Sequence, residues 1–156
     1  RDWSSDVCSS DLMDAIEEFL DAARYDEIDT LQQMTQKGFD VNSQDQFGTT
    51  ALHNASANGN IQCVDFLIQH GAILKRNDSG NTPLHRATLL QHIDVIKSIL
   101  SSIPNADVLE KNEFGQSSID IAFQTGNEEM INLLLSHDSA KPLEERVGYK
   151  GEEVKE

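Results

Sequence analysis

The stretch Gly80-Asn81-Thr82-Pro83-Leu84-His85 decides the fold, because related stretches recur at a regular interval on both sides of it. Residues 48–53 (GTTALH) stand 32 positions earlier, and residues 115–120 (GQSSID) stand 35 positions later. Landmarks further along each unit shift by the same intervals: Asn60, His92 and Asn127, then Leu67, Ile99 and Leu134. Features that move together in this way indicate an internal repeat of about 33 residues.

Each unit carries the signals of two helices joined by a tight turn. Thr50, Thr82 and Ser117 each supply a hydroxyl that can cap a first helix. Pro83 occupies the first helical position, where its missing N–H costs nothing, and Gly59 marks a turn between helices. Apolar residues then follow at helical spacing. The sequence predicts helix pairs at residues 13–24 and 27–36, 51–58 and 61–69, 83–90 and 92–102, and 118–125 and 127–136.

These residues resemble a known family. The string Thr82-Pro83-Leu84-His85, followed by Ala87, resembles the ankyrin-repeat signature, and the resemblance extends from Met13 to about Ala140. It implies an all-α fold, an ankyrin-repeat solenoid of stacked helix-turn-helix units joined by hairpin-like loops. Four units are expected, at about residues 12–44, 45–76, 77–111 and 112–140. The first unit lacks the signature and the last replaces it with Ser-Ser-Ile-Asp, as expected of end repeats, which have one neighbour fewer.

The resemblance also implies roles for the signature residues. In the family they are structural, and the histidine hydrogen-bonds its own loop and the neighbouring unit. The corresponding positions here are Thr50, His53, Thr82, Pro83, Leu84 and His85.

The two ends of the chain do not follow the repeat. Residues 1–12 have no apolar periodicity and resemble the translation of a sequencing adapter, so we expect a foreign or disordered leader and a native start at Met13. Residues 141–156 are rich in charge and poor in apolar residues, which predicts a flexible tail or the start of a linker.

The charge is strongly acidic, with 12 Lys and Arg against 27 Asp and Glu and a formal net charge of −15. Such a field repels phosphate backbones and anionic lipids, which disfavours nucleic acid and membrane surfaces as partners. A basic protein partner would complement it, although acidity can also serve solubility alone. Two cysteines, Cys8 and Cys63, make no disulfide framework; Cys63 falls at a core position, which predicts a buried free thiol in a reducing, intracellular compartment.

The sequence carries no motif for catalysis. It has no glycine-rich phosphate loop, no CxxC pair and no HExxH motif, so we expect neither an enzyme nor a bound cofactor or metal. The five histidines do not cluster in sequence. His53 and His85 take the structural position of the signature, and His70 and His137 lie near helix C-termini, where positive charge is favourable.

The resemblance places the recognition surface on the loop tips and on the exposed flank of the first helices. Large apolar residues at such positions are typical of an interface core. Phe47 and Phe114 can equally pack against the next loop, which leaves Leu89 and Leu90 as the stronger candidates. The predicted partner-binding residues are Tyr25, Phe47, Asn58, Asp78, Asn81, Leu89, Leu90, Glu113, Phe114, Gln124 and Thr125.

Two functions follow from this pattern. The first is a monomeric, cytoplasmic or nuclear adaptor, scaffold or chaperone that binds a protein client, similar in general build to the small ankyrin chaperones of ribosomal proteins. The second is the N-terminal targeting half of a larger enzyme, such as an ankyrin–methyltransferase fusion. The sequence beyond Glu156 would separate them, because a catalytic domain there would establish the fusion.

Overall fold

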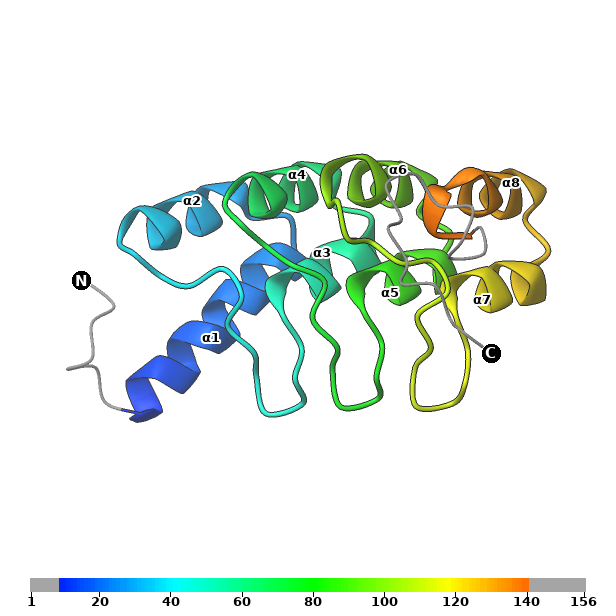
Figure 1. The fold of residues 1–156 in the computed structure, drawn as a ribbon. Coiled ribbons are helices and arrows are strands. Elements are labelled where there is room, and N and C mark those ends of the chain that lie inside the picture. Colours follow the sequence, from blue (N-terminus) through cyan, green and yellow to red (C-terminus); the bar gives the residue numbers. More distant parts are fainter. Residues whose placement is uncertain (1–8, 141–156) are drawn as a thin grey trace, which may run out of the picture.

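Eight α-helices stack as four antiparallel pairs in a computed structural model, which describes residues 9–140 (Figure 1). The first helices form one layer and the second helices form another, and the loops that join successive units project beyond the layer of first helices. The first helices are α1 (Ser9–Arg24), α3 (Ala51–Asn58), α5 (Pro83–Leu89) and α7 (Ser118–Thr125). The second helices are α2 (Ile28–Gln36), α4 (Ile61–Gln69), α6 (Ile93–Ser102) and α8 (Glu128–Ser136), and a short 3-10 turn, η1, covers Asp138–Ala140.

The predicted helix pairs are confirmed, and all but one of their boundaries agree to within one residue. The exception is α1, which begins at Ser9, so the expected leader contributes the first turn of this helix. Residues 1–8 and the predicted tail at 141–156 lie outside the described residues. The third unit is longer than the second because α6 extends to Ser102 and is followed by a loop containing Pro104.

A reciprocal capping box starts each first helix from α3 onward. The side chain of Thr50 accepts a hydrogen bond from the His53 N–H, and the His53 ring accepts one from the Thr50 N–H. Thr82 and His85 repeat this arrangement, with Pro83 in the first turn. The box satisfies two backbone donors that the helix itself cannot use, which explains why a hydroxyl residue and an acceptor three positions later recur at this place in the second, third and fourth units.

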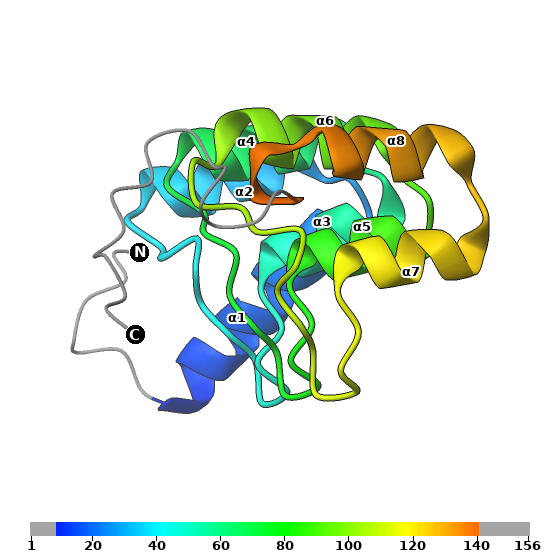
Figure 2. The same ribbon diagram turned by 45° about the vertical axis from the view of Figure 1, so that its right-hand side comes forward.

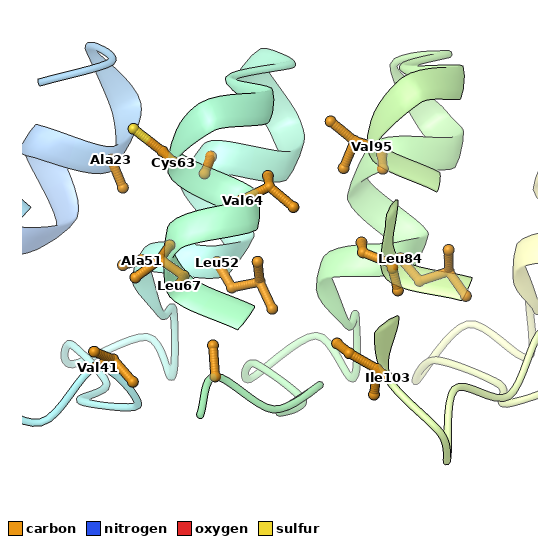
Figure 3. Packing of buried hydrophobic residues seen from close by; sticks show 14 of the residues in the cluster. Ala23, Val41, Ala51, Leu52, Cys63, Val64, Leu67, Leu84, Val95 and Ile103 are labelled. Atoms are coloured by element: carbon orange, nitrogen blue, oxygen red, sulfur yellow. The ribbon is translucent and has the colours of Figure 1, made fainter. Parts of the chain in front are cut away.

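The core is one continuous layer of apolar side chains between the two helix layers. Ala55, Ala87 and Ala122 are fully buried, and their small size lets paired helices approach closely. Figure 3 shows how side chains of α4 face both neighbours: Cys63 points toward Ala23 in the first unit, and Val64 points toward the third. Cys63 is a buried free thiol, as predicted, and burial raises its pKa to about 12, with the hydrogen bond to Asp26 (Sγ–Oδ1 3.3 Å) acting in the same direction.

Candidate protein-binding surface

The hairpin loops are built to one plan. In the second unit, Asp45 Oδ1 accepts hydrogen bonds from the backbone N–H groups of Phe47 and Thr49, at 2.8 and 2.9 Å. Asn77 and Asn112 do the same for the two residues at the equivalent places in their own loops. A short acceptor at the loop base therefore fixes each hairpin before any partner binds.

Neighbouring hairpins are also bonded to each other. The backbone N–H of Asp78 donates to the carbonyl of Phe47 at 2.9 Å, and the N–H of Glu113 donates to the carbonyl of Ser79 at 3.1 Å. The three loops consequently form one row, which projects from the first-helix layer at the bottom of Figure 1.

One histidine joins the second unit to the third, and another joins the third unit to the fourth. Nδ1 of His53 accepts the Thr50 N–H, so Nε2 carries the proton and donates to the carbonyl of Asn81 in the next unit at 2.8 Å. Nε2 of His85 makes the same contact to the carbonyl of Gln116, at 3.1 Å. Burial lowers the pKa of His53 to about 4 and also lowers the pKa of His85. Both rings are therefore neutral at physiological pH, and they support the loops from within the fold.

The large apolar residues predicted for binding are exposed. The exposed fractions are 66% for Tyr25, 60% for Phe47, 52% for Leu89, 48% for Leu90 and 74% for Phe114. The two phenylalanines do not pack away beneath the next loop, which was the alternative left open by the sequence. Exposure of this kind is what an interface residue needs in the free protein.

A first hollow of about 460 Å³ lies between α1 and the first hairpin. Three acids of α1 line it, Asp14, Glu17 and Asp21, whose spacing puts them on one side of the helix. Asp45 adds a fourth carboxylate from the hairpin, and Phe47 forms an apolar part of the wall. Figure 1 shows why they meet, because α1 runs obliquely down beside the loop row.

A second, smaller hollow of about 180 Å³ lies further along the same surface. Leu89 and Phe114 supply its exposed apolar wall, while Gln116 and Gln124 supply amide groups. Its lining contains no acidic residue. The surface therefore changes from acidic at the first unit to apolar and amide-rich at the third and fourth.

Arg86 separates the two hollows and lines both of them. Its Nε is buried and has no acceptor among the described residues. The guanidinium has further donors, which can bind a carbonyl of a segment lying along the surface. Sequence reasoning missed Arg86 because it follows the signature histidine at a position with no motif of its own.

Several other predicted binding residues have contacts within the fold. Asn81 is partly buried, and its side-chain oxygen accepts a hydrogen bond from Asn112 at 2.9 Å. Glu113 lies 3.5 Å from Arg76, so part of its charge is neutralised internally. Asp78 and Asn58 are exposed but line neither hollow, and Thr125 is partly buried at the end of α7.

Residues 9–140 hold no group of three or more His, Cys, Asp or Glu side chains placed to bind a metal ion. Over the same range, no helix has the length and apolar character needed to cross a membrane. Beside the first helices, the surface features are the loop row and the two hollows.

The fold and this surface define a repeat protein that presents a preformed surface to other macromolecules. A family model for ankyrin repeats (three copies) matches residues 19–112, and the chain belongs to the ankyrin-repeat family. Members of this family are interaction modules that are generally without enzymatic activity, so the chain is a protein-interaction module.

Curated relatives agree with this assignment. An ankyrin repeat protein of fowlpox virus is 33% identical over 131 residues, which is 81% of this chain and 38% of the relative. An ankyrin repeat protein of Rickettsia bellii is 30% identical over 124 residues, covering 78% of this chain and 67% of the relative. The RelA-associated inhibitor of mouse is 46% identical over 69 residues, 44% of this chain but 8% of that protein. The chain thus spans less than half of the fowlpox and mouse proteins.

Proposed function

We propose that the chain is an adaptor, scaffold or chaperone that binds a protein client along the two hollows, with a basic part of the client at the first unit and an apolar part at the third. The observation that carries this proposal is the change in chemistry along one surface. Four carboxylates line the first hollow, and the lining of the second contains none. A client with both features would bind in one direction only.

The acidic end would contribute mainly to the rate of association. Carboxylates that are exposed attract basic segments over a distance of about one Debye length, ~8–10 Å at moderate salt. One of the four carboxylates, Asp21, lies 3.4 Å from Arg24, so its charge is partly neutralised. The other three carboxylates are therefore the ones that would attract a client. We therefore expect association to slow as salt is added, with a smaller effect on dissociation.

The apolar end would contribute most of the affinity. Leu89 and Leu90 are about half exposed at the end of α5, and Leu89 shares the second hollow with Phe114. Burial of such side chains at the centre of an interface is worth about 2 kcal/mol or more each when they are hot spots. The preformed loop row lowers the entropy cost of binding.

An affinity pull-down with mass spectrometry would identify the client, whose binding is then measured with three variants. Changing both Leu89 and Leu90 to Ser should weaken binding by about 2 kcal/mol or more, at least roughly thirtyfold, while stability changes by no more than ~0.5 kcal/mol. Asp14→Asn with Glu17→Gln should slow association and reduce its dependence on salt. Ile73→Ser is the matched control, because Ile73 is 49% exposed but lines neither hollow. Equal binding by all variants would refute the proposed surface.

An N-terminal targeting role in a larger enzyme is a second proposal. The fowlpox and mouse relatives are longer proteins in which a similar segment occurs, and neither is named as an enzyme. In that case the same surface would recruit the substrate of the attached domain. We also propose that the protein is intracellular and acts as a monomer, which fractionation and sedimentation would test.

A further inference from the structure

The outer face of the fourth unit differs from every inner junction in the solenoid. At the position that packs against the next unit, the first three units have small residues: Ala23, Ser56 and Thr88, all fully buried. The fourth unit has Phe123 at this position, and it is 57% exposed. Figure 2 brings this end of the molecule forward, with α7 and α8 closest to the viewer.

The second helix shows the same change. Val64 and Ile96 are fully buried at inner junctions, whereas the equivalent Ile131 is only partly buried. Leu135 is 47% exposed, although its equivalents Ile68 and Leu100 are partly buried against the core. End repeats normally have a more polar outer face, so an apolar end face of this kind indicates that another protein segment covers it.

A fifth ankyrin unit would stack poorly on this face, for two reasons. The close approach of successive first helices depends on a small side chain where Phe123 stands. In addition, Asp120 replaces the histidine that donates to the next loop carbonyl in the two preceding units, as in the 2.8 Å bond from His53 to Asn81. The Asp120 carboxylate accepts hydrogen bonds from the Ser117 N–H and O–H, and it has no proton to donate. A carbonyl placed opposite it would be repelled.

We propose that this end face is a second interaction surface, for a protein segment with apolar residues flanked by Lys or Arg. The apolar residues would cover Phe123, Ile131 and Leu135. Asp120 lies one turn before Phe123 on the same face of α7, which places a carboxylate beside the apolar patch. The net charge of −15 disfavours a second copy of this chain in the same place and favours a basic segment. The proposal concerns a surface separate from the two hollows.

A library of random peptides displayed on phage tests this proposal, with the full chain as the target. Enriched peptides should combine apolar residues with Lys or Arg. Binding of these peptides should fall more than about tenfold with Phe123→Ser, because a central aromatic anchor is lost. Asp120→Asn, which keeps an acceptor for Ser117, should weaken binding less and reduce its salt dependence. Phe114→Ser is the matched control, an exposed phenylalanine in the second hollow, and should leave this binding unchanged.

Each remaining outcome counts against the proposal. Peptides that bind the Phe123→Ser variant as well as the original chain would place recognition elsewhere, and failure to enrich any basic apolar peptide would remove the stated partner. Sedimentation that shows a dimer lost on Phe123→Ser would assign the face to a second copy instead. Retained helical circular dichroism in the variant shows that the fold is intact. Because the control residue lies in the second hollow, a failure here is distinguishable from a failure of the proposed client surface.

Discussion

The second and third units differ from the fourth in the residue that completes the capping box. His53 and His85 cap their own helices and also reach the next unit through Nε2. Asp120 caps its own helix equally well, and the hydrogen bonds from Ser117 hold its pKa below the usual range. The comparison separates two functions of one position: local capping needs only an acceptor, and stacking also needs a donor.

The largest expected effect comes from removing the inner histidine. His85→Ala should lower the free energy of unfolding by about 2–4 kcal/mol. The change leaves a cavity, removes part of the capping box and leaves the Gln116 carbonyl without its hydrogen-bond donor. Asp120→Ala should cost only about 0.5–1 kcal/mol, because capping alone is lost. Urea unfolding of both variants measures the difference. Equal losses would contradict the comparison, and so would stoichiometric zinc binding that disappears with His85.

A change of pH should weaken the inner junctions through the same histidines. Burial lowers the pKa of His53 from 6.5 to about 4, so below pH 6.5 the unfolded chain binds more protons than the folded one. Stability should therefore be full above neutral pH and fall as the pH drops from about 6.5 toward 4, by ~3 kcal/mol from His53 when the loss is complete. Urea midpoints at neutral pH and at about pH 5 would show this slope. His53→Gln should flatten it, and an unchanged slope would show that other groups cause it.

The helix turns give the smallest of the three effects. Gly59 and Gly126 have nearly the same φ, +70° and +71°, yet a Cβ at Gly59 would lie 2.6 Å from Nδ1 of His92. A Cβ at Gly126 would meet nothing within 4 Å. Both substitutions to Ala incur the left-handed strain of about 1–2 kcal/mol, and Gly59→Ala should cost about 1 kcal/mol more. Thermal unfolding of the two variants, with and without His92→Ala, isolates that extra cost, which should vanish when His92 is removed.

The repeat made the fold predictable from the sequence. Three parallel sets of landmarks placed the six helices of the second to fourth units at both ends, because caps and turns recur with the period, and the apolar spacing at Ile28, Leu31 and Met34 placed α2. The predicted start of α1, at residue 13, was wrong by four residues, because neither a capping residue nor an apolar periodicity marks Ser9. The turns in the first and third units also gave no signal, because Asp26 and Gln91 adopt φ of 61° without being glycine.

The binding surface was less predictable. The sequence identified which residues stand at variable positions, and the exposure of Leu89, Leu90 and Phe114 agrees with that reasoning. It did not show that Asp14, Glu17 and Asp21 face the first hairpin, although their spacing in the sequence places them on one side of a helix. The missing information was the oblique direction of α1, which depends on packing across units. Phe123 was missed because its significance appears only when equivalent positions are compared for burial.

The hydrogen bonds between units have a consequence for how the chain folds. Side-chain bonds such as Asn54 to Leu20, Asn60 to Ala23 and His92 to Ala57 join residues 34 to 37 positions apart. Each therefore closes a loop of about one repeat, and the entropy cost of closure stays nearly constant along the chain. A folding nucleus formed by the second and third units can extend in either direction by adding one neighbour at a time. Amide exchange should consequently be slowest in α3 and α5 and should quicken toward α1 and α8.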